Sequence, residues 1–309
     1  MIDMHIHTKY SDGTYTVKEV LEKSEELGLK YISITDHDNC RAYSELNELN
    51  IRDYYSGKVI QGIELKCLYN GRLIEILGYN YNKEKLENWL NDFYKNRQRK
   101  DTQKKYFNIL YDACVKIGLE MKPKETIEWN PENDWASVTV YQELKSHEAN
   151  KERLPEDFWN DFTTFTKKYC ADFNSPFYID KSNDYPKLSE AISAVKDAGG
   201  TVIVAHAFIY KWAKDKESFI KDLHENYDID GFECYHSSFS EEQIEYILKY
   251  CQDNNLLMSG GSDCHGDNKP EINLAVGKGN LKIDKKIIEP WVNLWFIKKL
   301  ENKSGLQYL

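Results

Sequence analysis

The sequence lacks any long apolar run. No stretch approaches the roughly 18 apolar residues that a membrane-spanning helix needs. The first residues contain neither the charged n-region nor the apolar h-region of a secretory signal. Internal repeats and low-complexity tracts are also missing. We therefore expect a folded, cytoplasmic protein with no membrane partner.

An excess of basic charge and a pattern of paired cysteines are missing as well. The chain has 41 Lys and Arg against 51 Asp and Glu, which gives a formal net charge of −10. Long nucleic acids and anionic membranes need an extended basic face, so neither is expected as a partner. The 7 cysteines are odd in number and scattered, without a Cys-x-x-Cys spacing, which favours reduced thiols over disulfides or a zinc ribbon.

The chain is organised as an α/β domain with an insertion. Its 309 residues exceed the usual length of one compact domain. In residues 1–82 and 186–309, short apolar strands alternate with amphipathic helices, a pattern typical of βα units around a parallel sheet or barrel. Residues 83–185 instead contain long helical segments rich in polar and aromatic residues, which we interpret as an inserted helical lobe.

Ionisable side chains gather where the predicted strands end. In "IDMHIH" the alternation of a strand places His5 and His7 on one face. The strand-end residues are His5, His7, His37, His206, His236 and His265, with Asp12, Glu64, Glu75 and Asp263. In βα barrels, residues at the carboxyl ends of the strands lie together at one end of the barrel. Imidazole and carboxylate groups are suitable ligands for Mn²⁺, Fe²⁺ and Zn²⁺. The sequence therefore predicts a multinuclear metal site.

Each motif alone has a simpler interpretation. "HIH" is also found as a core or exposed pair, and "SDG" is an ordinary turn. "TDHD" and "GSDCH" are more informative, because a carboxylate near a histidine at a strand end is costly to bury without a partner. It is their joint occurrence that favours a metal site.

The order of these motifs resembles a known family. "HIHTKYSDG", "ITDHD", "GIE", "VAHA" and "GSDCHG" are similar to the polymerase and histidinol phosphatase family of metallophosphoesterases. The stretch "GGTVIVAH" and the later "YHSSFSEEQ" and "GGSDCHGDNKP" resemble most its nucleoside-bisphosphate phosphatase and exoribonuclease branch. The resemblance covers roughly residues 1–80 and 186–280. It implies a distorted (β/α)7 barrel with the inserted helical subdomain, and hydrolysis of phosphate esters.

The resemblance also implies a ligand set for two to three divalent ions of manganese, iron or zinc. The ligands implied for the first ion are His5, His7, Glu64 and Asp263. The second ion would share Glu64 and bind His206, and the third would bind Asp12, His37 and His265. Glu75 stands where the family usually has a histidine. A carboxylate is a harder ligand, so it favours manganese or magnesium over zinc, or it lowers the occupancy of the second site.

In the implied reaction, a hydroxide activated by the metal ions attacks the phosphate. His236 matches a histidine common in this branch and would contact the substrate or protonate the leaving group, unless it is only a structural residue of the rim. Arg97 and Lys104 are candidates for a substrate phosphate, because they lie near one face of a predicted helix. The alternative is an ordinary solvated helix face.

The predicted substrates are small phosphomonoesters of nucleotides, such as nucleoside 3′,5′-bisphosphates. Trimming of short oligonucleotides from their 5′ ends by an exonuclease or phosphodiesterase is the main alternative, and the acidic charge fits only short ones. A histidinol-phosphate phosphatase and a non-catalytic, metal-stabilised module are the others. The region "WASVTVYQELKSH" lacks the Arg-Pro-His-Ile-Ala stretch of the related branch, which leaves the substrate open.

Overall fold

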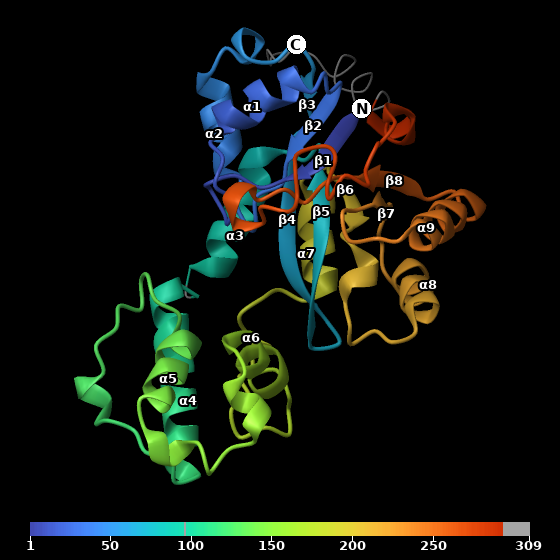
Figure 1. Cartoon of the computed structure of the whole chain (residues 1–309). Helices are drawn as coiled ribbons and strands as arrows, with labels where there is room; N and C mark the ends of the chain where they lie inside the picture. Colours follow the sequence, from blue (N-terminus) through green and yellow to red (C-terminus); the bar gives the residue numbers. More distant parts are fainter. Residues whose placement is uncertain (96, 293–309) are drawn as a thin grey trace. The chain divides into compact units, whose positions relative to one another are not determined.

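The computed structural model describes residues 1–95 and 97–292 (Figure 1). Residue 96 of the predicted lobe and residues 293–309 of the predicted barrel lie outside the described residues. The chain divides into two compact units. The first unit contains Met1–Asn91 and Pro186–Leu309, and the second contains Asp92–Tyr185.

The first unit is built on two sheets. Its strands are β1 (Ile2–Ile6), β2 (Tyr31–Ile34), β3 (Lys58–Val59), β4 (Gly62–Tyr69), β5 (Arg72–Tyr79), β6 (Thr201–Val204), β7 (Gly231–Tyr235) and β8 (Leu257–Gly260). The smaller sheet has the order β1-β2-β3, and the larger has the order β4-β5-β6-β7-β8. All pairs are parallel except those of β5, which runs antiparallel to both β4 and β6.

The antiparallel strand β5 differs from the βα units expected throughout this region. A two-residue turn at Asn70 and Gly71 joins it to β4, and both residues have positive φ angles, 49° and 75°. Asn-Gly at this position is the usual signal of a tight hairpin, because both turn residues must adopt the left-handed conformation. A local turn signal, rather than a crossover helix, therefore sets the direction of β5.

Isolated bridges join the two sheets at two places. Ile6 at the end of β1 pairs with Cys264 after β8, and His37 after β2 pairs with Glu64 in β4. The amide of His7 donates to the carbonyl of Cys264 at 2.9 Å. These bridges bring the carboxyl ends of β1, β2 and β8 together with the first half of β4.

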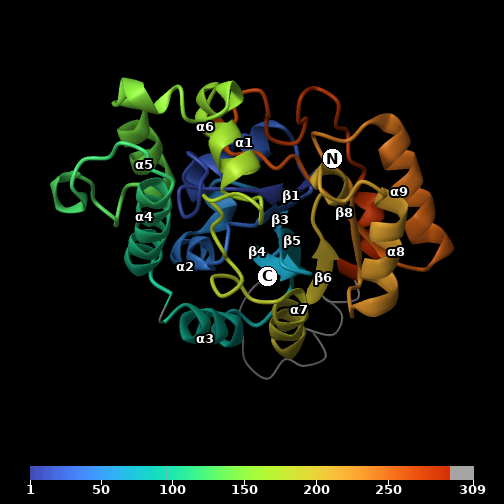
Figure 2. The same ribbon diagram turned by 90° about the horizontal axis from the view of Figure 1, so that it is seen from below.

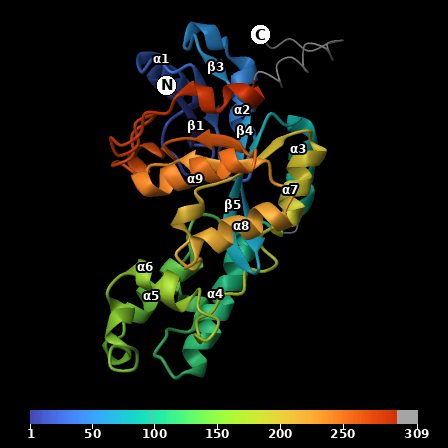
Figure 3. The same cartoon turned by 90° about the vertical axis from the view of Figure 1, so that its right-hand side faces the viewer.

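Helices cover the sheets of the first unit. They are α1 (Val17–Glu26), α2 (Arg41–Glu48), α7 (Leu188–Asp197), α8 (Lys216–Asn226) and α9 (Glu241–Asp253), and α3 (Lys83–Tyr94) begins in this unit. Helix α7 packs on β4, β5 and β6, and α9 packs on β7 and β8. Figures 2 and 3 show α8 beside α9, where His224 Nδ1 lies 3.1 Å from the hydroxyl of Tyr250.

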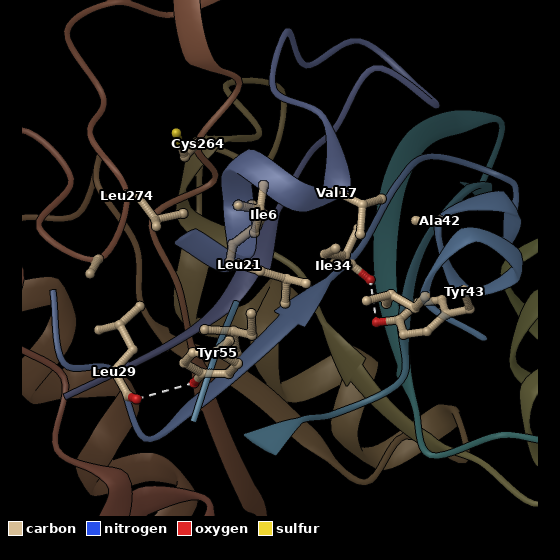
Figure 4. Packing of buried hydrophobic residues seen from close by; sticks show 14 of the residues in the cluster. Ile6, Val17, Leu21, Leu29, Ile34, Ala42, Tyr43, Tyr55, Cys264 and Leu274 are labelled. Atoms are coloured by element: carbon tan, nitrogen blue, oxygen red, sulfur yellow. Dashed lines mark hydrogen bonds between the residues drawn. The ribbon is translucent and has the colours of Figure 1, made fainter. Parts of the chain in front are cut away.

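One hydrophobic cluster fixes the end of β1 (Figure 4). The residues labelled in that view are Ile6, Val17, Leu21, Leu29, Ile34, Ala42, Tyr43, Tyr55, Cys264 and Leu274, and all are buried. The hydroxyl of Tyr43 donates to the carbonyl of Ile34 at 2.8 Å and lies deep in this core. Because Ile6 is packed in this core, the backbone of the neighbouring His5 and His7 is held in position. All seven cysteines are buried and free, as predicted.

The second unit has its own core of aromatic residues. Its helices are α4 (Arg99–Lys116), α5 (Ala136–Lys145) and α6 (Phe162–Thr164), followed by a π-helical turn, Phe165–Tyr169. The largest fully buried side chains include Phe158, Phe165 and Phe177. Among the described residues, no helix combines the length and the apolarity needed to cross a bilayer.

The prediction that one helix carries both Arg97 and Lys104 is wrong. Helix α3 ends at Tyr94 and α4 begins at Arg99, so Arg97 lies in the connection and shares no helix face with Lys104. Its Nε donates to the carbonyl of Asn183 at 2.7 Å, and its guanidinium stacks on Phe93. Hydrogen bonds to backbone carbonyls hold this side chain in the connection between the two helices.

Candidate metal centre

His5 and His7 meet two carboxylates at the end of β1. Both imidazoles are fully buried. Nε2 of His5 lies 3.2 Å from Glu64 Oε2 and 3.5 Å from Asp263 Oδ1. Nε2 of His7 lies 3.1 and 3.3 Å from the same two oxygens. Strands β1 and β4 and the loop after β8 thus bring together a group that could hold one metal ion.

A second group forms on the other side of His7. Asp12 Oδ1 lies 3.2 Å from His265 Nε2, and Asp12 Oδ2 lies 3.5 Å from His37 Nε2. With His7, these residues also could hold one ion. The Asp12 side chain is 53% exposed, so this group faces solvent while the first is enclosed.

Glu64 joins these groups to a third one. Its side chain is almost fully buried, and Oε1 lies 2.9 Å from His206 Nε2. Glu75 Oε2 lies 3.5 Å from the same nitrogen. In the hairpin Glu75 pairs with Lys66, two residues after Glu64, so both carboxylates project from one face of the sheet. The antiparallel hairpin thereby places Glu75 at the group, although it does not lie at a strand end.

The other ring nitrogen of each of four histidines has a hydrogen-bond partner. His265 Nδ1 lies 2.8 Å from the carbonyl of Asp263, which can only accept. His7 Nδ1 lies 3.3 Å from the hydroxyl of Ser11, whose own proton goes to Asp36. The remaining pairs are His5 Nδ1 with Glu233 at 2.8 Å and His206 Nδ1 with the Tyr210 hydroxyl at 3.2 Å. We infer that His5, His7 and His265 carry the proton on Nδ1, whereas the Tyr210 hydroxyl can either donate to or accept from His206.

The consequence is a set of Nε2 lone pairs directed at carboxylates. In the described part of the chain, the buried atoms His5 Nε2, His7 Nε2 and His37 Nδ1 have no hydrogen-bond partner. A lone pair that faces a carboxylate is repulsive unless a proton or a metal ion lies between them. Orphaned nitrogens and anionic oxygens around the same points are a donor set that fits divalent metal ions.

The pKa values of His7 and Glu64 also indicate that this group of residues favours bound positive charge. Burial alone would lower the pKa of His7, but Asp263 and Glu64 raise it to about 9. Burial would raise the pKa of Glu64, yet His5 and His37 hold it well below its usual value. In the metal-free group His7 therefore holds a proton at neutral pH, and a metal ion that takes its Nε2 must displace that proton.

Glu233 and Tyr210 are functional candidates that the sequence analysis missed. Glu233 is almost fully buried on β7, and its second oxygen accepts the backbone N–H of His206 at 2.8 Å. The Tyr210 hydroxyl also accepts the backbone N–H of Glu75 at 2.8 Å. The signal for Glu233 was present in "GFECYH", because a carboxylate inside an apolar strand requires a buried partner.

His236 follows β7 and lies at the edge of the group. It is buried, its Nε2 lies 3.5 Å from Asp263 Oδ2, and its Nδ1 accepts the backbone N–H of Ser238. The proton of the neutral ring is therefore on Nε2. Burial lowers the pKa of His236, and the neighbouring Asp263 offsets this effect only in part.

The predicted phosphate contacts Arg97 and Lys104 belong to the second unit. Lys104 is exposed on α4. The two histidines that the sequence left out of the site have local partners, since His147 contacts Glu143 at 2.8 Å and His224 contacts Tyr250. These two histidines have structural contacts outside the metal groups.

Comparison with known proteins decides the family. The model of the PHP domain matches residues 3–293. The chain belongs to the PHP domain family. A relative from Eggerthella lenta, named phosphoribosyl 1,2-cyclic phosphate 1,2-diphosphodiesterase, is 24% identical over 270 residues, 85% of this chain and 94% of the relative. A 5′-3′ exoribonuclease of Haemophilus influenzae is 25% identical over 296 residues, 94% and 97% of the two chains.

A relative from Chromobacterium violaceum bears the name 3′,5′-nucleoside bisphosphate phosphatase, with 22% identity over 268 residues, 85% of this chain and 87% of the relative. The fold of this PHP protein is similar to that of a solved protein of Bifidobacterium adolescentis described as a metal-dependent phosphoesterase. The TM-score is 0.60 at 21% identity, and the similarity covers 94% of this chain and 95% of the other. The chain is a metal-dependent phosphoesterase with a mixed α/β PHP fold, as its motifs predicted.

Proposed function

We propose that this PHP protein hydrolyses terminal phosphomonoesters of nucleotides, such as nucleoside 3′,5′-bisphosphates. The observation that carries the proposal is the pair of buried Nε2 atoms of His5 and His7, which have no hydrogen-bond partner and face the carboxylates of Glu64 and Asp263. The named activity of the Chromobacterium violaceum relative supports this substrate class.

Two to three divalent ions fit the three groups. The proposed ligands are His5, His7, Glu64 and Asp263 for the first ion, Glu64, Glu75 and His206 for the second, and Asp12, His37 and His265 for the third. The carboxylate of Glu75 favours manganese over zinc or iron at the second position. Bound ions supply the positive charge that activates a water nucleophile and neutralises the phosphate oxygens.

The residues of the chain supply the rest of the chemistry. The enclosed position of His5 and His7 keeps bulk water from the first group. His236 is proposed to contact the substrate through its Nε2–H, because it is buried at the edge of the group, while protonation of the leaving oxygen would require its imidazolium form. Glu233 holds the ring of His5 in the tautomer that leaves Nε2 free, and Tyr210 holds the orientation of the His206 ring.

Further parts of the proposal concern architecture and location. We propose that the bridges between Ile6 and Cys264 and between His37 and Glu64 close the two sheets into the distorted barrel predicted from the motifs. Residues 83–185 are proposed as the inserted helical lobe, in which Arg97 and Lys104 stay candidates for substrate contacts. Seven buried free thiols agree with a cytoplasmic location.

The alternative is removal of nucleotides from the 5′ ends of short oligonucleotides. The relative from Haemophilus influenzae, which aligns with nearly the whole chain, is named for that activity. The two functions differ in the bond that is cleaved, since a phosphatase releases inorganic phosphate and an exonuclease releases a nucleotide.

We expect the manganese-loaded protein to release inorganic phosphate from a nucleoside 3′,5′-bisphosphate. A 5′-phosphorylated oligoribonucleotide of a few residues and histidinol phosphate serve as competing substrates, and elemental analysis counts two to three ions per chain. A chelator should abolish the activity. Release of mononucleotides at a higher kcat/KM than that for phosphate would favour the exonuclease. One ion or none after growth with manganese would contradict the multinuclear centre.

We expect Glu233→Gln to weaken metal binding about 10- to 100-fold. The amide oxygen of glutamine must accept the N–H of His206, so its NH₂ group faces His5 Nδ1. His5 then carries its proton on Nε2, the atom that faces Glu64 and Asp263. Titration with manganese, followed by calorimetry, measures the change.

Glu241→Gln is the matched control, because this glutamate is exposed at the start of α9. The melting temperature of both metal-free variants should stay near that of the wild type. Equal manganese affinity in Glu233→Gln and wild type would show that Glu233 only satisfies backbone and ring donors and does not position a ligand.

A further inference from the structure

Lys269 lies against the candidate metal centre. Its Nζ is 2.8 Å from Oδ2 of Asp263. The Asp263 side chain is 9% exposed, whereas that of Lys269 is 37% exposed. The ammonium group therefore lies at the boundary between the buried carboxylates and solvent.

The two oxygens of Asp263 face different partners. Oδ1 is the oxygen near His5 and His7, at 3.5 and 3.3 Å. Oδ2 is the oxygen near Lys269 and the Nε2 of His236. A cation that takes Oδ1 together with the histidines therefore leaves the contact between Oδ2 and Lys269 in place. Lys269 and His236 form the donor side of this carboxylate, opposite to its metal-ligand side.

The backbone around Lys269 is fixed in position. The N–H of Lys269 donates to the carbonyl of Gly266 at 3.1 Å, and Asn268 Nδ2 donates to the carbonyl of Asp12 at 2.8 Å. Gly266 has a φ of 61°, and a Cβ at this position would lie 2.2 Å from the hydroxyl oxygen of Thr14. The turn is thus tied to the loop that carries Asp12, and the lysine is held over the centre before a ligand arrives.

The ammonium group of Lys269 has N–H donors that Asp263 does not use. It carries three N–H bonds, and within residues 1–95 and 97–292 Asp263 is the one partner that it contacts. Asp263 is one anion placed between the ammonium group and the first proposed ion, so the positive charges on its two sides together still favour a further anion. A phosphate that bridges from the ions to this side of Asp263 would supply that anion, and lysine is a common point-charge partner of phosphate.

We propose that Lys269 binds a non-bridging oxygen of the phosphate group that is hydrolysed, on the same side of Asp263 as His236. This assignment rests on the proposed phosphoesterase function and adds a phosphate-binding residue to it. Lys269 would act on the phosphate itself, so it should contribute equally for every phosphomonoester, whatever group the phosphate is attached to.

The test is the affinity of the manganese-loaded protein for inorganic phosphate, measured by calorimetry, with metal content measured in the same samples. We expect Lys269→Met to weaken phosphate binding and kcat/KM about 10- to 100-fold while the number of bound ions stays unchanged. Lys269→Arg should remain within a few-fold of the wild type. Lys282→Met is the control, because this exposed lysine precedes Ile283, whose carbonyl pairs with Ile2 at the opposite end of β1.

Unchanged phosphate affinity in Lys269→Met would overturn the assignment, as would a manganese-loaded wild type that binds no phosphate. Loss of metal ions in proportion to loss of phosphate binding would also overturn it, because Lys269 would then serve only as the counter-charge of Asp263. A wild type that binds manganese and phosphate but hydrolyses no phosphoester would overturn the proposed function. The difference in phosphate affinity between wild type and Lys269→Met would still decide the role of Lys269.

Discussion

Asp263→Asn and His5→Ala are each expected to reduce kcat/KM for a phosphomonoester by roughly a thousandfold or more. Asp263 supplies the oxygen that faces both His5 and His7, and His5 supplies the most enclosed nitrogen of the centre. Loss of either leaves the first ion without one of its four proposed ligands. Steady-state hydrolysis and elemental analysis of the same preparations measure the effect.

The two variants differ in what they do to the fold. Asp263 has a φ of 58°, a left-handed conformation that asparagine tolerates well, so Asp263→Asn should retain the backbone. His5→Ala removes the partner of the buried Glu233 and should also lower the melting temperature. Asp263→Asn is therefore the cleaner test of catalysis.

The exposed Asp267, in the turn just after His265, provides the matched control. Asp267→Asn makes the same chemical change in the same loop and should leave hydrolysis and metal content unchanged. Retained activity in both Asp263→Asn and His5→Ala would contradict the assignment of the first group.

The sequence was sufficient to predict which residues gather, because the alternation of a strand and the positions of strand ends are local properties. His5 and His7 follow from the period of β1, and the polar residues after β2 and β8 follow from the end of an apolar run. These local rules, together with the order of the motifs, were enough to predict the family and a metal site.

The partners that orient the ligands could not be predicted in this way. The contact between His5 and Glu233 joins residues 228 positions apart in the sequence, and it depends on how β1 and β7 are arranged in space. His206 and Asp263 have positive φ angles of 30° and 58°, which direct their side chains in ways that no residue preference would indicate. Tertiary structure, rather than local pattern, determines which nitrogen of each ring is free.

The direction of β5 shows how a missed local signal changes the interpretation of a site. The Asn70-Gly71 turn makes β5 the second strand of a hairpin, so Glu75 is inside a strand and not at its end. It still reaches the centre, because the antiparallel register places it opposite Lys66 and on the same face as Glu64. Glu75 thus lies 3.5 Å from His206 as a residue inside a strand, and its role as a ligand stays a prediction.

Glu75→Ala is expected to lower activity and metal affinity about 10- to 100-fold or more, whereas Glu75→His should preserve activity and shift the metal preference from manganese toward zinc or iron. The side chain is only 16% exposed and lies 3.5 Å from His206, so a solvent-facing role at the rim is disfavoured. Burial and the nearby Glu64 raise the pKa of Glu75, which is the cost that a bound cation would remove.

The alanine variant has two separable effects. It removes one of the few ligands that belong to the second ion alone, and it removes a carboxylate that repels Glu64 in the metal-free protein. The metal-free variant should therefore be at least as stable as the wild type, while its metal-loaded form should gain less stability from manganese. A merely structural glutamate would show the opposite, with lower stability in both forms.

Activity and melting temperature across titrations with manganese and zinc test this assignment for the wild type, Glu75→His and Glu75→Ala. Glu245→Ala is the control, since this glutamate is exposed in the middle of α9. If Glu75 is a ligand, manganese should give the higher activity in the wild type and zinc the higher activity in Glu75→His, because imidazole is the softer donor. Curves that coincide for all three proteins would mean that water, and not Glu75, completes the second site.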